Sequence, residues 1–155
     1  MYPIYSLGDT INSFFESQST VTRRQCDDLA ASLVGEPVNT APIQGAFIYT
    51  VIAGLEQSKI VQFRAQRSVL DMETLNLARA IYGRFVAACT YHGNIGQSLP
   101  LSVYVIENLP GTTYVQARCI NGHSVKPSLE AQSPQFNIVV GFARYIELGA
   151  TFMLD

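Results

Sequence analysis

The residues best suited to chemistry are two histidines and three cysteines, and their spacing decides what they can do. A zinc site needs closely spaced ligand pairs such as C-x2-4-C, and these five residues show no such spacing. The chain also contains neither a G-x-S-x-G nucleophile elbow nor a G-x4-G-K-[ST] phosphate loop. We therefore predict no metal site and assign no catalytic residue. The five positions are Cys26, Cys89, Cys119, His92 and His123.

Cys89 and His92 are the one pair close enough in sequence to suggest a nucleophile and its base. In a strand, however, residues three apart point to opposite faces, so the pair is not expected to act together. His92-Gly93, followed by Asn94, is interpreted as a pair of turn residues.

Composition predicts one folded domain over residues 1–155. Hydrophobic residues make up 48% of the chain and charged residues 14%, far from the composition of disordered proteins. The charged fraction is below the roughly 25% of ordinary soluble domains, so part of the surface is expected to be apolar and to meet a partner. The net charge of −2 argues against a nucleic-acid partner.

The cysteines and the N-terminus predict a cytoplasmic protein. An odd number of cysteines without C-x-x-C spacing suits a reducing compartment. The first residues, Met1–Tyr5, show no basic region followed by an apolar one. No stretch approaches the ~20 apolar residues that span a bilayer, so no membrane partner is expected.

The spacing of apolar residues predicts helices at the start of the chain, then a hairpin of two strands, and then further helices and strands. We expect helices within residues 1–36, over 71–82 after the N-cap Asp71, and over 137–148, with a loop over 119–135. Strands are expected over 46–53 and 59–64 as a hairpin, and over 85–91 and 101–107. This order predicts an α+β fold, an antiparallel sheet with a helix packed on one face, flanked by the N-terminal helices and a C-terminal helix.

Four stretches carry a resemblance to a known family. Taken together, they resemble the N-terminal lobe of the aminoglycoside phosphotransferase and choline kinase-like (protein kinase-like) family, especially its fungal members. The likeness divides the chain into N-terminal helices (1–36), a kinase-lobe-like core (43–114), and a loop with a capping helix (115–155). The stretches are residues 42–51, 60–64, 70–79 and 103–113.

The resemblance implies a nucleotide site, with ATP and magnesium as the expected ligands. Gly45 would match the turn that covers the phosphates, and Arg64 would match the basic residue of the third strand. Glu73 would match the helix carboxylate that pairs with that basic residue. The hinge that reads adenine through its backbone would lie over 106–109, including Glu107 and Leu109.

Ordinary structural roles compete with these assignments. Gly45 could be a plain turn glycine, Arg64 a surface arginine, and Glu73 an acid favoured by the helix dipole. The family's later His-Gly-Asp loop and magnesium-binding segment do not follow Gly111. The resemblance therefore implies a phosphotransferase-like lobe that is catalytically incomplete by itself, so whether the chain is an enzyme stays open.

Two other functions remain open. One is a non-catalytic interaction or oligomerisation module, whose partner would be a second copy, a missing C-lobe or another chain. The other is a small metabolite-processing enzyme that uses the same cleft, with Tyr91 and His92 beside Arg64 and Glu73 as its polar groups.

Overall fold

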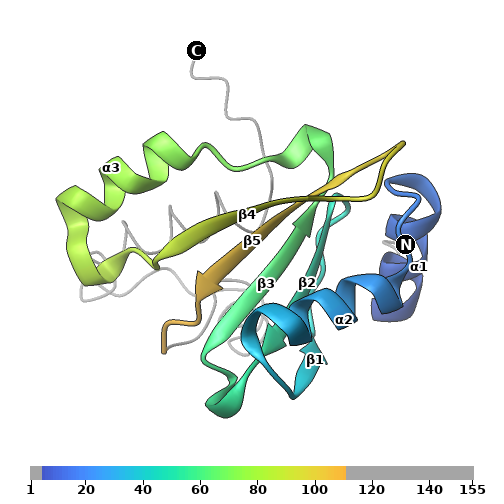
Figure 1. The fold of residues 1–155 in the computed structure, drawn as a ribbon, viewed down its shortest axis with the longest axis horizontal. Coiled ribbons are helices and arrows are strands. Elements are labelled where there is room, and N and C mark those ends of the chain that lie inside the picture. The colour runs from blue at the N-terminus through green and yellow to red at the C-terminus, as the bar shows by residue number, and fades with distance from the viewer. Residues whose placement is uncertain (1–4, 111–155) are drawn as a thin grey trace, which may run out of the picture.

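An antiparallel five-stranded sheet and three helices form the part of the chain that can be described. The computed structural model describes residues 5–110 of the 155 (Figure 1). The predicted α+β class is confirmed. The helices are α1 (Leu7–Ser17), α2 (Arg23–Val34) and α3 (Met72–Tyr82), and the strands are β1 (Val38–Thr40), β2 (Ile48–Ala53), β3 (Lys59–Arg64), β4 (Cys89–Ile95) and β5 (Leu101–Glu107).

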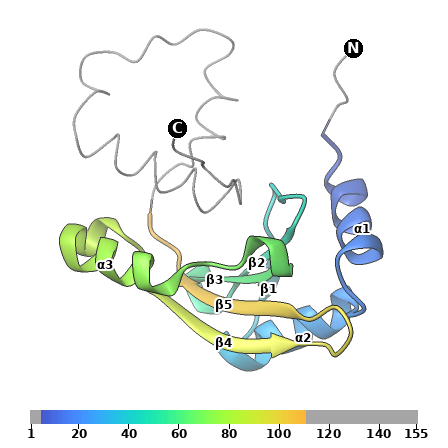
Figure 2. The same ribbon diagram turned by 90° about the horizontal axis from the view of Figure 1, so that it is seen from above.

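The strands lie in the order β1-β2-β3-β5-β4, and every neighbouring pair is antiparallel. The helix α3 connects β3 to the edge strand β4, so β5 takes the place beside β3. Figure 2 shows α3 at the opposite end of the sheet from α1. The sheet thus has one short edge, β1, and one longer edge, β4.

Local sequence explains where the helices begin. Ser6 caps α1 by accepting a bond from the backbone of Asp9, and Thr22 forms a reciprocal capping box with Gln25. Asp71 caps α3 by accepting from the backbones of Glu73 and Thr74. Hydrogen bonds from Thr74, first of all that of its side chain, lower the pKa of the Asp71 carboxyl.

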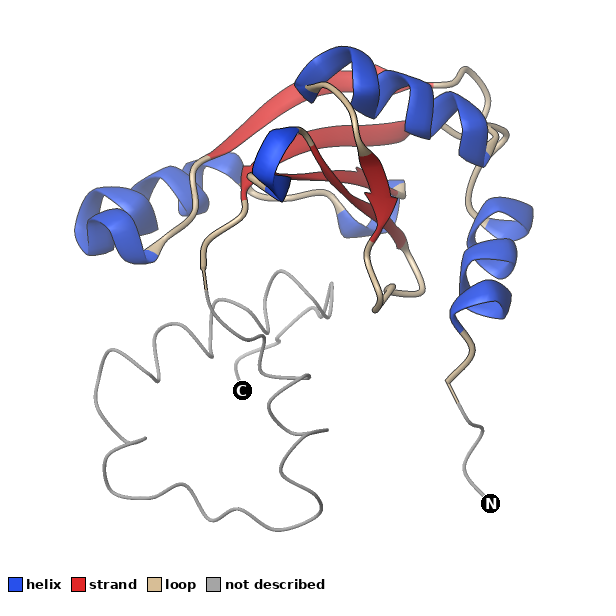
Figure 3. Cartoon of the chain, turned by 90° about the horizontal axis from the view of Figure 1, so that it is seen from below, coloured by secondary structure: helices blue, strands red, loops and turns tan. Residues whose placement is uncertain are grey.

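Each face of the sheet packs against different helices. On one face, side chains of β2, β3 and β5 form the main core with α1 and α2. Figure 3 shows α2 lying across the sheet and α1 standing beside it. On the other face, Tyr104 and Ile106 of β5 pack against Leu70 and Leu75 beside and within α3. We call this second side the α3 face. Its smaller core leaves room for polar side chains.

A buried tyrosine ties α2 to the sheet on the first face. The hydroxyl of Tyr49 donates to Asp27 over 2.8 Å and accepts from Nε of Arg23 over 3.1 Å. Burial, together with the Asp27 carboxylate, raises the pKa of Tyr49 to about 12. The phenol therefore stays neutral and keeps both bonds at physiological pH.

One expected strand was placed wrongly along the chain, and one strand was missed. The strand predicted over 85–91 is in fact β4 over 89–95, and residues 83–85 form a 3-10 turn instead. The error arose because Gly93 was interpreted as a turn residue that ends the strand. Gly93 has φ +86° and lies within β4, in a bulge where the β4–β5 register shifts between Tyr91 and Asn94. The strand β1 was not predicted at all.

The helix predicted over 137–148, and with it the loop over 119–135, lies outside the described residues. Within residues 5–110, no helix has the length and apolar character required to cross a membrane. The single-domain boundaries stay a prediction.

Candidate functional site

Polar side chains gather on the α3 face where three strands run side by side. Arg64 of β3 lies opposite Ile48 of β2 on one side and opposite Ser102 of β5 on the other. Two residues earlier in β3, Gln62 lies opposite Tyr104 of β5. Cross-strand partners share a face, so Gln62 and Arg64 lie on the same side as the core under α3. Arg64, Gln62 and Ser102 are all buried. Burial of such groups requires hydrogen-bond partners.

Arg64 is the most deeply buried charge in the described chain, with 1% of its surface exposed. Its Nε donates to the carbonyl of Ser68, and its Nη1 donates to Oε1 of Gln62 over 2.7 Å. These are not its only interactions. The interpretation of Arg64 as a surface arginine is therefore wrong, because its strand lies in the middle of the sheet.

The Gly45 turn lies at the same end of β3 as Arg64. Gly45 bridges to Ile48, which lies opposite Arg64, and the carbonyl of Phe47 accepts from the backbone of Ala65 and the hydroxyl of Ser68. The structure thus brings the predicted glycine turn and the predicted basic residue together.

Gln44, which sequence reasoning missed, holds this turn. Its side-chain amide donates to the carbonyls of Ala41 and Thr50, and its Oε1 accepts from the backbone of Thr50 over 2.8 Å. The Gln44 backbone donates to the hydroxyl of Tyr5. The glutamine therefore continues the β2 hydrogen bonding just before Gly45 and fixes the position of the turn.

Glu73 is not brought to Arg64. It is exposed in the first turn of α3, and the ion pairs within residues 5–110 do not join it to that arginine. The ion pair between α3 and the sheet is made instead by Arg79, whose Nη1 lies 3.8 Å from Oε2 of Glu107 and donates to the carbonyl of Val86 over 2.6 Å.

The predicted hinge leaves β5 at the other end of β3. Lys59, the first residue of β3, lies opposite Glu107. The backbone of Glu107 donates to the carbonyl of Ala88, and that of Asn108 donates to the carbonyl of Ser58. Two backbone donors are therefore already used, and a ligand that reads this segment would meet the N–H of Leu109 next. Leu109 is 37% exposed.

Asn108 is a second residue that sequence reasoning missed. Its side-chain amide donates to the carbonyl of Gln57 over 2.7 Å. Gln57 and Glu56 both have left-handed backbones, with φ of 53° and 61°, which is uncommon for residues other than glycine. The segment after β5 is thus held against the turn between β2 and β3. The available signal was the type of residue, since asparagine often bonds to turn backbones.

Tyr91 and His92 lie on the edge strand and are exposed. The Tyr91 hydroxyl donates to Oδ1 of Asn94, which also accepts from Ser102, and the Tyr91 ring lies 5.3 Å from that of Tyr104. Tyr91 thus continues the polar row from Ser102 toward the edge. Cys89 is half-buried beside Met72, and burial raises its pKa to about 11, so it is unsuited to act as a nucleophile.

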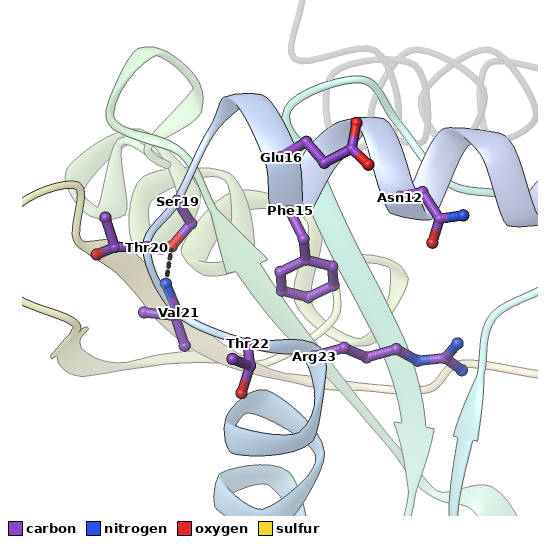
Figure 4. Close-up of a pocket in the computed structure, with 8 residues that line it drawn as sticks. All are labelled: Asn12, Phe15, Glu16, Ser19, Thr20, Val21, Thr22 and Arg23. Atoms are coloured by element: carbon purple, nitrogen blue, oxygen red, sulfur yellow. Dashed lines mark hydrogen bonds between the residues drawn. The ribbon is translucent and has the colours of Figure 1, made fainter.

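The described surface also has a shallow hollow away from these residues. It has a volume of about 360 Å³ and lies between α1 and the start of α2, lined by residues including Phe15, Glu16 and Arg23 (Figure 4). The hydroxyl of Ser19 accepts from the backbone of Val21 at its edge. The side chains that line this hollow are partly apolar, partly polar and partly charged. They do not form a convergent set of polar groups that would select a ligand.

Within residues 5–110, no group of three or more histidine, cysteine or acidic side chains could hold a metal ion. Comparison with known proteins yields no match to a family model, to a curated protein or to a solved structure. The functional interpretation therefore depends on the residues and their placement alone.

Proposed function

We propose that the chain is a nucleotide-binding lobe resembling that of a small-molecule phosphotransferase, and that it is catalytically incomplete by itself. The observation that carries the proposal is the placement of the candidate segments along β3. The Gly45 turn and Arg64 lie at one end of the strand, and Glu107–Leu109 lie at the other. Five residue steps in a strand cover roughly 17 Å, a span suited to an extended nucleoside triphosphate.

The order of elements supports the same function. In protein kinases a glycine-rich loop covers the phosphates and the basic residue comes from the third strand. Here Gly45 lies between β1 and β2, and Arg64 ends β3. The phosphates would approach the Gly45 turn, with the buried guanidinium of Arg64 behind it, and the adenine edge would meet the N–H of Leu109.

The arrangement departs from the kinase pattern at α3. The kinase pair between the third strand and the helix is not formed by Glu73, which is exposed. Gln62 and the Ser68 carbonyl hold the Arg64 guanidinium instead. In this proposal they orient the positive charge, and Glu73 has no part in binding.

The test is a calorimetric titration of the chain with a non-hydrolysable ATP analogue and magnesium. Saturable binding is expected for the original chain and for Arg64→Lys, which keeps the charge, and loss of binding is expected for Arg64→Met. Urea unfolding of both variants would verify that they are folded. Absence of binding at millimolar nucleotide, or equal binding by Arg64→Met, would contradict the proposal.

A further inference from the structure

One side of α3 is apolar and exposed. Of the eleven residues of α3, Leu75 alone is buried. Leu77 and Ile81 are each 62% exposed, and Phe85 in the following turn is 42% exposed. Short helices in proteins owe most of their stability to packing of an apolar face. An apolar side that stays this exposed indicates a contact with something beyond residues 5–110.

The exposed residues form a line. Glu73, Leu77 and Ile81 are four positions apart, which places them on the same face of a helix. The line extends about 12 Å along the axis from Glu73 to Ile81. Figure 2 shows α3 at the end of the sheet away from α1. The line thus gives a narrow apolar strip with an acid at its start.

Charge along the strip is asymmetric, and this asymmetry selects the partner. Glu73 lies at the first turn, and Arg84 follows the last, its guanidinium 5.4 Å from the ring centre of Phe85. Antiparallel pairing with the same helix would place Leu77 opposite Ile81 twice and bring each Glu73 toward the other chain's Arg84. Parallel pairing would bring like charges together. The antiparallel arrangement also aligns the helix dipoles favourably.

We propose that this strip of α3 is a self-association surface, on which a second copy of the chain packs antiparallel. Such a pair is isologous, because the same patch serves both copies. Two helices of this length bury less than the ~1,200–2,000 Å² of stable interfaces, so the affinity belongs to the weak, micromolar class. This surface goes beyond nucleotide binding and does not depend on it.

Sedimentation velocity over a range from low micromolar to near-millimolar protein tests the proposal. The sedimentation coefficient should rise with concentration toward that of a dimer. Leu77→Lys should weaken association at least about tenfold. The matched control is Leu55→Lys, at a residue 81% exposed in the turn between β2 and β3, and it should associate like the original chain.

Charge reversal distinguishes a specific antiparallel pair from general stickiness. Glu73→Arg and Arg84→Glu should each weaken association, and the chain carrying both should recover it, because the opposite charges meet again across the pair. Circular dichroism verifies that the variants fold. A monomer at all concentrations, equal effects of Leu77→Lys and Leu55→Lys, or no recovery in the double reversal would overturn the proposal.

Discussion

Arg79, in the last turn of α3, lies 3.8 Å from Glu107 at the end of β5. The same guanidinium donates to the carbonyl of Val86, and Oε2 of Glu107 accepts from the backbone of Ala88. One arginine therefore connects the end of the helix, the segment before β4 and the end of β5. Because β5 leads into Glu107–Leu109, this contact also fixes the start of the candidate hinge.

Removal of the Arg79 side chain should lower the free energy of unfolding. The ion pair is about half exposed and contributes little by itself, whereas the charged hydrogen bond to Val86 contributes more. Together they predict a loss of about 1–2 kcal/mol for Arg79→Ala, measured by urea unfolding. Arg24→Ala, which removes a highly exposed pair with Asp28, is the control and should change stability little. Equal losses would contradict the role of Arg79.

Two glycines should respond oppositely to alanine. Gly96 in the β4–β5 turn has φ +92°, and a Cβ there would lie 2.5 Å from Cγ2 of the buried Val21. Backbone strain and overpacking predict a loss of about 2–4 kcal/mol for Gly96→Ala.

Gly8 in α1 is the matched position, because a Cβ there meets nothing within 4 Å. Gly8→Ala should raise stability by up to about 1 kcal/mol, since alanine is the better helix former. Thermal unfolding of both variants measures the contrast. A stable Gly96→Ala variant would show that the turn does not pack against the segment between α1 and α2.

Local signals in the sequence were sufficient for most elements. The Thr22–Gln25 capping box, the Asp71 N-cap and the terminal Gly83 fix helix ends through bonds within a few residues. The hairpin of β2 and β3 follows from its β-branched and aromatic residues. β1 was not predicted because its three residues are too few to show a periodic pattern. The predicted position of β4 was wrong because a bulge lets the strand continue through Gly93.

The candidate site depended on contacts that no local pattern contains. Burial of Arg64 follows from its register with Ile48 and Ser102, which are far from it in sequence. The strongest sequence signal for the site was Gln62, a polar residue between the apolar Val61 and Phe63. Because side chains alternate along a strand, Gln62 is expected on the face opposite these two residues. Pairing of Arg64 with Gln62 rather than Glu73 required the three-dimensional structure.

Stability should fall at alkaline pH because of Cys26. Burial, and secondarily the Asp27 carboxylate, raises the pKa of this thiol from 9.0 to about 12. Between these pH values the folded chain holds a proton that the unfolded chain releases, so the folded state binds more protons and the free energy of unfolding decreases as pH rises. One such group contributes a slope of at most about 1.4 kcal/mol per pH unit.

Cys26→Ala should therefore flatten the decrease above pH 9.0, whatever its effect on stability at neutral pH. Urea unfolding at a series of pH values measures the two slopes. Tyr49 and Cys89, whose pKa values are also raised by burial, to about 12 and about 11, keep some slope in the variant. Parallel curves for the two chains would show that Cys26 ionises equally in both states.

The proposed adenine contact can be tested at one backbone N–H. The donors of Glu107 and Asn108 are used within the fold, so Leu109→Pro should remove the donor left for a ligand. Proline lacks the N–H but otherwise suits a position before another proline, where the chain is already extended. Loss of one such hydrogen bond predicts roughly tenfold weaker binding of the ATP analogue.

Leu99→Pro is the matched control, because Leu99 also precedes a proline and is exposed, but lies in the turn between β4 and β5. It should bind the analogue as the original chain does. Titration with the triphosphate group alone, as inorganic tripolyphosphate, separates the two ends of the site. Leu109→Pro should leave its affinity unchanged, since the phosphates would meet the Gly45 turn at the other end of β3. Equal weakening of both ligands would instead mean that the substitution disturbs the sheet and that Leu109 reads no base.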